Sequence, residues 1–375
     1  MAIKATASFS LKDALFNPDS VRRLSLGIAQ GLPAFNAEAF EQQVLQKFPE
    51  LELKARINWM VTVLEAHLPA DFATAVSILA AALPAPLDPA KTDDDFGEFI
   101  WSVPAEYVAR HGCTTARLAL SLAFLRESTQ RFSAENAIRP FLKHFSQETL
   151  EFVQSCTTDQ NYHVRRLASE GIRPFLPWAE RVNLPVENIL TVLQQLFADR
   201  TRYVTRSVAN TINDISKIDP TRTVQVLQQW RLQQPSAETE WVIRHALRTL
   251  VKKDHAGALE LLGYPTTPAF RVSGIRIPAE VRVGESIAYQ CRLHSDAAQV
   301  LRVALRVYYQ KANGTLAPRV FAVRDLDTAA GQTLTINKSI SFKAITTRSL
   351  HPGKHQVELV VNGVARGRKD FVLEV

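Results

Sequence analysis

A segment of ten residues recurs three times along the middle of the chain, and this recurrence restricts the possible folds more than any other feature. The copies are YHVRRLASEG (162–171), RYVTRSVANT (202–211) and EWVIRHALRT (240–249), which begin 40 and 38 residues apart. Every copy has a ring in its second position, a valine in its third and an arginine in its fifth. Repeats of about this length are typical of HEAT-type helical pairs, which stack into a solenoid with a concave surface.

Helical spacing separates two faces of each copy. The valines lie on the face that we expect to pack against neighbouring repeats. The arginines lie on another face, together with the residues four and seven positions further on. This second face comprises Arg166, Glu170 and Arg173, then Arg206, Asn210 and Asn213, then Arg244, Arg248 and Val251, followed by Lys252. We interpret it as a ladder of cationic and amide groups suited to a polyanion, with an ordinary solvated helix face as the alternative.

The first copy lies in NYHVRRLASEGIRPFLPW (161–178), where we expect a helix that two prolines break just before Trp178. On such a helix Arg166 and Arg173 flank the carboxylate of Glu170. Glu170 can still be a simple ion pair across one helical turn, worth about 0.3–0.5 kcal/mol. Trp178 can equally be a packing residue that closes the repeat.

The rest of the first two-thirds of the chain also has helical periodicity, with polar residues where helices should begin. We expect Asn36, Ser133, Ser146 and Asp219 to cap helices, because their side chains can accept hydrogen bonds from the first backbone N–H groups. We also expect Pro69-Ala70-Asp71 to open the helix that follows it.

The composition changes after residue 263. Seven segments that alternate or are rich in β-branched residues follow, separated by turn signals such as Asn313-Gly314 and Asn362-Gly363. About seven strands in this length predict an immunoglobulin-like sandwich. We therefore expect an all-α HEAT-like-repeat solenoid in residues 1–263 and a small all-β immunoglobulin-like sandwich in residues 267–375.

Charge is unevenly distributed along the chain. Residues 1–130 carry 11 basic and 15 acidic side chains (−4), residues 131–266 carry 17 and 14 (+3), and residues 267–375 carry 16 and 8 (+8). This basic gradient suits a polyanionic partner. We interpret the run of three aspartates at 93–95 as a solvated loop rather than a metal site, because no other ligand-type residues stand near it.

Several classes of protein lack support in the sequence. A glycine-rich phosphate loop and a zinc motif are both missing, which disfavours kinases, nucleoside triphosphatases and zinc hydrolases. The three cysteines stand far apart and indicate neither a metal site nor a disulfide framework. The sequence has no run of about eighteen apolar residues and no apolar signal core, so we expect a cytoplasmic protein without a membrane span.

Three runs together resemble the AlkC branch of the AlkC/AlkD alkylpurine DNA glycosylases: residues 161–178, RSVANTINDISK (206–217) and WVIRHALRTLVKK (241–253). The resemblance covers residues 10–263, and the sandwich resembles the extra domain of some AlkC proteins, which we expect to contact DNA as well. It implies a monofunctional enzyme that hydrolyses the N-glycosidic bond of cationic alkylated bases, such as 3-methyladenine, in duplex DNA. It also implies that the base is not fully extruded, in contrast to most base-acting enzymes. We expect a monomer without cofactor or metal.

The resemblance suggests roles for individual residues. A cationic base leaves without being protonated, so catalysis needs a carboxylate near the developing oxocarbenium ion, a placed water molecule and an electron-rich ring. We expect Glu170 to be the main carboxylate and Trp178 the aromatic wall, with Glu135 and Asp214 as secondary catalytic candidates. The expected DNA-binding residues are Arg166, Arg173, Arg206, Asn210, Asn213, Trp241, Arg244, Arg248 and Lys252. For Trp241 the sequence does not decide between a position facing the DNA and one in the core.

Two other functions fit a helical repeat with an arginine-rich face. One is a non-catalytic protein that recognises DNA structure, and the other is a protein-interaction scaffold. Release of a free methylated base from alkylated DNA distinguishes the glycosylase from both.

Overall fold

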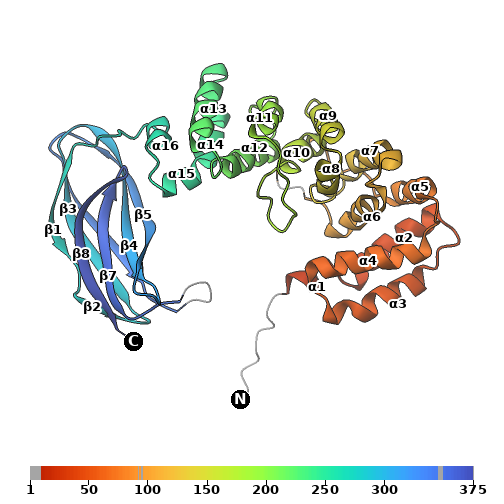
Figure 1. The fold of residues 1–375 in the computed structure, drawn as a ribbon, viewed down its shortest axis with the longest axis horizontal. Coiled ribbons are helices and arrows are strands. Elements are labelled where there is room, and N and C mark those ends of the chain that lie inside the picture. The colour runs from red at the N-terminus through yellow and green to blue at the C-terminus, as the bar shows by residue number, and fades with distance from the viewer. Residues whose placement is uncertain (1–9, 92, 94–95, 345–348, 375) are drawn as a thin grey trace, which may run out of the picture. The chain divides into compact units, whose positions relative to one another are not determined.

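The computed structural model describes residues 10–91, 93, 96–344 and 349–374, with helices in the first two-thirds and strands in the last third (Figure 1). The predicted order, helical repeats followed by a two-sheet β-sandwich, is confirmed. Within the described part of the chain no single helix is long and apolar enough to cross a membrane; two consecutive helices, Leu53–His67 and Phe72–Ala82, pass that test only as a pair bent by 119°.

The chain forms two compact units whose boundary differs from the change of secondary structure. The first comprises residues 1–215 with 233–246, and the second comprises residues 216–232 with 247–375. The change from helix to strand falls between Leu261 and Phe270. The last short helices therefore belong with the sandwich, and the division into domains at residues 263–267 stays a prediction.

The first unit is entirely helical. Its helices, with η marking a 3-10 helix, are α1 (Leu11–Leu15), α2 (Pro18–Gly31), α3 (Ala37–Lys47), η1 (Phe48–Glu50), α4 (Leu53–His67), α5 (Phe72–Ala82), η2 (Phe99–Trp101), α6 (Ser102–Gly112), η3 (Thr115–Arg117), α7 (Leu118–Ser128), α8 (Arg139–His144), α9 (Ser146–Cys156), α10 (Tyr162–Glu170), α11 (Val186–Gln194), α12 (Arg202–Ile215) and α14 (Ala237–Ala246).

Two of the four predicted helix caps, Asn36 and Asp219, are confirmed, and Asp71 caps the helix that it was expected to open. The side chains of these three residues accept hydrogen bonds from backbone N–H groups of the first turn, at 2.8–3.0 Å. The other two predictions are wrong. Ser146 is itself the first residue of α9 and makes no cap, and the hydroxyl of Ser133 bonds a neighbouring glutamate instead.

The three sequence copies form helices that pack side by side, α10 against α12 and α12 against α14 (Figure 1). Val164, Val204 and Val242 are completely buried, so the predicted packing face is confirmed. One expectation is wrong: α10 ends at Glu170, and Arg173 lies in the irregular segment that follows rather than on the helix.

The described residues of the second unit form three helices and eight strands. They are α13 (Pro220–Gln233), α15 (Arg248–Lys252), α16 (Ala256–Leu261), β1 (Phe270–Arg276), β2 (Glu280–Arg282), β3 (Ser286–Ser295), β4 (Gln299–Gln310), β5 (Leu316–Thr328), β6 (Thr333–Ser341), β7 (Gly353–Val361) and β8 (Val364–Glu374). Gln233, the last residue of α13, belongs to the first unit.

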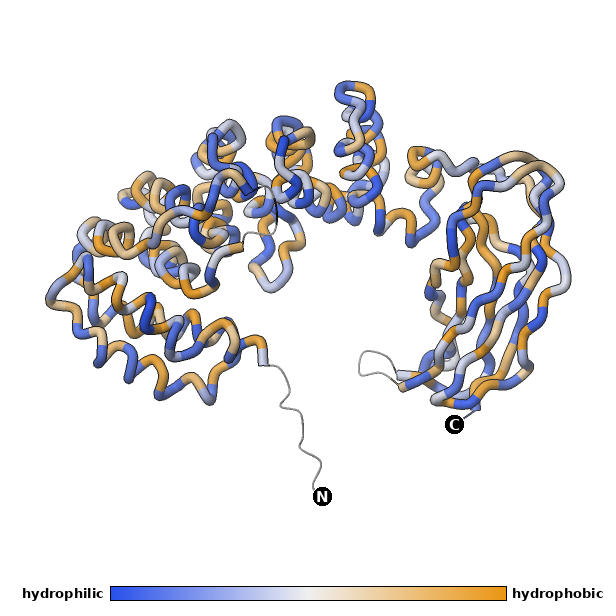
Figure 2. The backbone as a smooth tube through the Cα atoms, turned by 180° about the vertical axis from the view of Figure 1, so that it is seen from behind, coloured by the Kyte–Doolittle hydropathy of each residue, from blue (hydrophilic) through white to orange (hydrophobic). Residues whose placement is uncertain are grey.

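The strands form one sheet of order β1-β3-β6 and another of order β2-β8-β7-β4-β5. Hydrophobic and hydrophilic residues alternate along the strands (Figure 2), and the inward set forms the core between the sheets. The sequence missed β2, which has only three residues and pairs in parallel with β8. Gly314 and Gly363, in two predicted turns, have φ of 78° and 83°, a conformation that favours glycine.

Buried ion pairs connect the last helices to the sandwich within the second unit. Asp254, just after α15, pairs with Arg306 Nη2 at 2.6 Å and with Arg302 Nη1 at 3.6 Å, both on β4. Glu358 on β7 accepts hydrogen bonds from Arg306 at 2.9 Å and from Arg368 at 2.8 Å. Paired charges, and not only the covalent linker, therefore hold the sandwich on the helices that precede it.

Candidate active site

The first unit contains a cavity of about 600 Å³. Its walls come from α1, α2, α10 and α12, from residues 96–100 and 132–136, and from the irregular segment after α10. The cavity gathers three of the four predicted catalytic side chains, Glu135, Glu170 and Trp178. Two of the predicted DNA-binding arginines, Arg166 and Arg173, line it as well.

Arg166 joins the two carboxylates of the cavity. Its Nη1 lies 2.6 Å from Glu135 Oε2, and its Nη2 lies 3.7 Å from Glu170 Oε1. The guanidinium also lies over the ring of Tyr203, 4.6 Å from the ring centre. Burial alone would lower the pKa of Arg166, but the two carboxylates outweigh burial and raise the pKa, so this group stays charged.

Glu170 lies between two arginines, as its spacing indicated. Its Oε1 accepts a hydrogen bond from Arg173 at 2.7 Å, and its Oε2 accepts one from the hydroxyl of Ser207, also at 2.7 Å. The side chain is only 6% exposed. Burial would raise the pKa of Glu170, but the charges of Arg166 and Arg173 outweigh burial and hold the pKa below its usual value. Glu170 is therefore ionised at neutral pH.

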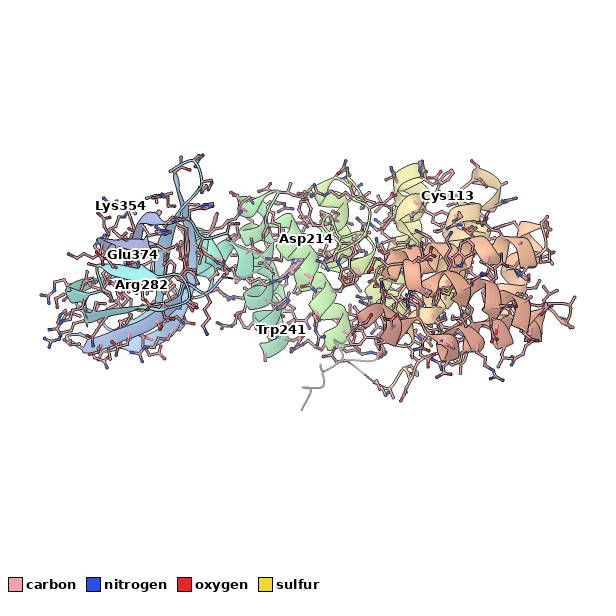
Figure 3. All side chains as sticks on the ribbon, turned by 90° about the horizontal axis from the view of Figure 1, so that it is seen from below. Cys113, Asp214, Trp241, Arg282, Lys354 and Glu374 are labelled. Carbon is pink, nitrogen blue, oxygen red and sulfur yellow. The ribbon has the colours of Figure 1, made fainter. Side chains whose placement is uncertain are left out.

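Asp214, the fourth catalytic candidate, is the least exposed of them. Its residue is 1% exposed, and it does not line the cavity. Its carboxylate instead accepts hydrogen bonds from Arg173 Nε at 3.0 Å and from the backbone N–H of Phe175 at 3.3 Å (Asp214 is labelled in Figure 3). Asp214 therefore holds Arg173 in this structure, and its assignment as a secondary catalytic carboxylate stays a prediction.

The two site arginines are less open than expected. Arg166 has 13% and Arg173 has 10% of its side chain exposed, and both bind carboxylates. These contacts favour one of their predicted roles, keeping Glu170 ionised, over the other, contact with DNA phosphates.

Trp178 is the most exposed of the aromatic residues that line the cavity, ahead of Phe96. Its residue is 69% exposed, and its backbone has φ of 61°, a left-handed conformation that is strained for a bulky side chain. Strain of this kind costs about 1–3 kcal/mol and is retained mainly at functional sites. The exposure excludes the alternative that Trp178 closes the repeat as a packing residue, and it leaves the indole available to a ligand.

The repeated arginines of α12 and α14 differ in their surroundings. Arg244 is exposed, whereas Arg206 pairs with Asp93 from the loop after α5. The aspartate run was expected to be solvated, and for Asp93 that expectation is wrong because its carboxylate is bound. The other two aspartates of the run lie outside the described residues.

The amide part of the predicted ladder is mostly structural. Asn213 is 3% exposed and donates a hydrogen bond to the backbone carbonyl of Ala246 at 2.7 Å, and its assignment to DNA binding stays a prediction. Asn210 is half-buried beside His245, and its Oδ1 lies 3.1 Å from His245 Nε2. Arg248 and Lys252 belong to the second unit, so their alignment with the ladder stays a prediction.

Trp241 lies in the middle of α14 and is labelled in Figure 3, and two groups lie on its ring. The guanidinium of Arg202 lies 3.9 Å from the ring centre, and the imidazole of His245 stacks on the ring at 4.8 Å with an angle of 9°. These contacts link α14 to α12 and leave less of the indole face for a base. A direct contact of Trp241 with DNA stays a prediction.

Sequence reasoning missed three polar contributors to the site, Ser133, Ser207 and Tyr203. Ser133 and Tyr203 line the cavity, and Ser207 holds Glu170. Tyr203 could have been found, because it occupies the ring position of its repeat copy, whereas the serines have no distinguishing pattern. Among the described residues, no group of three or more His, Cys, Asp or Glu side chains could hold a metal ion.

Comparisons with known proteins agree with this arrangement. The model of a family described as DNA alkylation repair enzyme matches residues 129–250, and the model of the C-terminal Ig-like domain of the uncharacterised protein YhaZ matches residues 271–375. YhaZ of Bacillus subtilis (strain 168) is 31% identical over 362 residues, which cover 95% of this chain and 98% of YhaZ. A solved structure of the Pseudomonas fluorescens alkylpurine DNA glycosylase AlkC, bound to DNA containing an abasic site analog, has a TM-score of 0.85 and 33% identity. That match covers 98% of this chain and 100% of the other.

The helical repeats, the cavity and these matches define a class, the helical-repeat enzymes of DNA alkylation repair. The two-sheet domain is confirmed as Ig-like. More narrowly, the chain belongs to the AlkC branch of this family, as the resemblance of its sequence indicated.

Proposed function

We propose that this chain is a DNA glycosylase that hydrolyses the N-glycosidic bond of cationic alkylated bases in duplex DNA. The observation that carries the proposal is one cavity in which the exposed indole of Trp178 accompanies two carboxylates, Glu135 and Glu170, that share Arg166. Family membership supports the reaction class, because the similar Pseudomonas fluorescens protein is an alkylpurine DNA glycosylase.

The chemistry of the lesion matches what the cavity offers. A purine alkylated at N3 already carries a positive charge, so no general acid is needed to protonate it. As the bond to the base breaks, positive charge develops on the deoxyribose in an oxocarbenium-like transition state. A fixed negative charge near that sugar lowers the barrier. An indole face adds an attraction of about 0.5–2 kcal/mol for a cation.

The two carboxylates have different access to a substrate. Glu135 has 21% of its side chain exposed and Glu170 has 6%. We assign the fixed negative charge to Glu170, as the sequence suggested, because its two arginines keep it ionised. We assign the attacking water to Glu135, because its carboxylate is the more open of the two.

Duplex DNA is the proposed partner, held mainly through its phosphates. Arg244 is exposed on α14, and Arg206 occupies the matching repeat position on α12, where it pairs with Asp93. The sandwich region adds a balance of +8 in residues 267–375, which supports a second contact with the same polyanion. The Pseudomonas fluorescens relative was solved with DNA.

Three finer features follow from the resemblance to AlkC and from the chemistry. We propose a preference for bases of the 3-methyladenine type. We propose removal without full extrusion of the base from the duplex. We also propose monofunctional action without strand cleavage, because a water molecule is the nucleophile and the reaction needs no lysine Schiff base.

The test is identification by mass spectrometry of the bases released from methylated duplex DNA by the full-length protein. Release of 3-methyladenine, with the DNA strand left intact until alkali is added, is the expected result. A purified, folded protein that binds this DNA but releases no base would instead support the non-catalytic alternative and end the proposal.

A further inference from the structure

The segment that carries Trp178 has no regular secondary structure. Residues 171–180 consist of turns, a bend and irregular chain in the connection between α10 and α11. A strained, exposed indole on such a segment needs partners that fix the backbone around it, because unpaired backbone groups and strain both favour rearrangement.

One side chain supplies these partners. Arg139, at the start of α8, is 1% exposed. It donates hydrogen bonds to the backbone carbonyls of Gly171 at 2.9 Å, Arg173 at 3.1 Å and Glu180. These carbonyls lie on both sides of Trp178 in the sequence, so a single guanidinium ties the two ends of the segment together.

Burial of the Arg139 guanidinium without a hydrogen-bonded carboxylate costs free energy of folding. Burial and the nearby charge of Arg173 lower the pKa of Arg139 to about 10. Its Nη2 has no hydrogen-bond partner among the described residues. A buried position chosen for stability alone is normally apolar or fully paired. The arrangement is therefore better explained by what the three carbonyl contacts hold in place.

A short internal repeat in the sequence supports this explanation. The pentapeptide IRPFL occurs at 138–142 and again at 172–176. The arginine of the first copy is Arg139, which binds the backbone of the second copy. The arginine of the second copy is Arg173, which binds Glu170 and Asp214. Arg139 on α8 therefore contacts the backbone of Arg173, and the side chain of Arg173 in turn contacts the carboxylate of Glu170.

We propose that Arg139 is a positioning residue, which fixes the segment 171–180 and thereby sets the placement of Trp178 and of the Arg173–Glu170 pair. Arg139 does not line the active-site cavity, so it acts through these residues and not on the substrate. The inference rests on the proposed glycosylase function for its effect on rate, but the placement of Trp178 can be measured without any reaction.

The test compares Arg139→Gln and Arg139→Lys with the wild-type full-length protein. Glutamine can reach one carbonyl at most. Lysine keeps the positive charge but lacks the planar set of N–H donors of a guanidinium, so both variants should loosen the segment. We expect single-turnover base release to fall by about 100-fold in Arg139→Gln, and by less in Arg139→Lys, because small misplacements of reacting groups have effects of this size. Affinity for DNA should stay within about threefold, since phosphate contacts are untouched.

Fluorine NMR reports the local surroundings of Trp178 in the folded protein, and a general loss of stability does not change this signal. The chain has five tryptophans, so labelling with 5-fluorotryptophan gives five resonances, and Trp178→Phe identifies that of Trp178. In the folded variants of Arg139, the Trp178 resonance should shift or broaden while the resonances of Trp59 and Trp230 stay in place.

Arg165 provides a matched control in the same solenoid. It is also buried and also donates to two backbone carbonyls, those of Asp159 and Gln160 at 2.8 and 3.0 Å, but it does not line the cavity or contact the tryptophan segment. Arg165→Gln should lower thermal stability and leave the rate of base release within about twofold. Equal losses of rate in Arg139→Gln and Arg165→Gln, or an unmoved Trp178 resonance in both Arg139 variants, would overturn the proposal. If the wild type releases no base, the glycosylase function fails, while the resonance of Trp178 still decides whether Arg139 holds the segment.

Discussion

Glu170→Gln is the substitution that tests the electrostatic part of the mechanism most directly. The carboxamide has nearly the shape of the carboxylate, and its oxygen can still accept the hydrogen bond from Arg173. What changes is charge. Three carboxylates (Glu135, Glu170 and Asp214) and two guanidiniums (Arg166 and Arg173) form one connected cluster with a net charge of −1, which the substitution brings to 0.

The size of the effect follows from the burial of the site. With Glu170 only 6% exposed, an effective dielectric constant of about 20 is appropriate. For a developing cation about 6 Å away, one unit charge then contributes roughly 3 kcal/mol. This corresponds to a loss of about 100-fold in the rate of base release. Binding of undamaged DNA, which depends on phosphate contacts elsewhere, should change little.

The pH dependence of stability should change as well. Because the folded-state pKa of Glu170 is lowered, its ionisation stabilises the fold above the ordinary carboxyl pKa of 4.5, and this stabilisation is lost as pH falls through the folded-state value. The variant should therefore melt at a lower temperature than the wild type at pH 7, and the difference should shrink below pH 4.5. Thermal unfolding followed by circular dichroism at both pH values measures this.

The assay is single-turnover release of methylated base, followed by mass spectrometry at saturating enzyme. Glu238→Gln is the control, because Glu238 also binds an arginine, Arg202, at 2.6 Å and the hydroxyl of Thr205, but lies outside the cavity. That variant should keep its rate within about twofold. If Glu170→Gln retains the wild-type rate while folded, the fixed charge near the sugar does not come from Glu170 and the reasoning is refuted.

Three further predictions concern the surroundings of the cavity. Trp178→Ala should reduce base release by about 2- to 30-fold with an unchanged melting temperature, because the indole is exposed and offers only a cation–π contact; a wild-type rate would show that the indole does not meet the developing cation. Arg206→Ala combined with Arg244→Ala should make the slope of log binding constant against log salt shallower by about 1.8, as expected for two lost phosphate contacts; an unchanged slope would remove both from the interface. Asp93→Asn should raise affinity for duplex DNA at low salt by at most about fivefold, since the partly buried ion pair between Asp93 and Arg206 is lost and no longer competes with phosphate; equal affinity in a filter-binding titration would show that the pair does not compete.

Much of the fold was predictable because it depends on periodic burial. Val164, Val204 and Val242 occupy the same position in three copies. A buried valine that recurs every 38 to 40 residues remains recognisable although the residues between the copies vary. The sandwich was predictable for the same reason, since strand alternation is repeated over the whole region. The strand β2 escaped because three residues cannot show an alternation.

The site was predictable only where charge and helical spacing coincide. The pairing of Glu170 with Arg166 follows from a separation of four residues within one helix. The depth of Asp214 and Asn213 did not follow, because both lie on the ladder's helix but turn toward neighbouring elements, where they satisfy Arg173 and a backbone carbonyl. Helical spacing gives the direction of a side chain, whereas burial depends on which helix lies there.

The irregular segment after α10 shows where local reasoning ends. Its two prolines lack N–H groups, so the carbonyls of Glu170 and Arg173 have no helical partner four residues ahead, and this much can be read from the sequence. The partner that the carbonyl of Arg173 finds instead is Arg139, 34 residues earlier in the chain. A helix that local propensity could not sustain was thus replaced by a conformation that a distant side chain stabilises. The strained backbone of Trp178 depends on that contact, so its exposure could be found only from the three-dimensional structure.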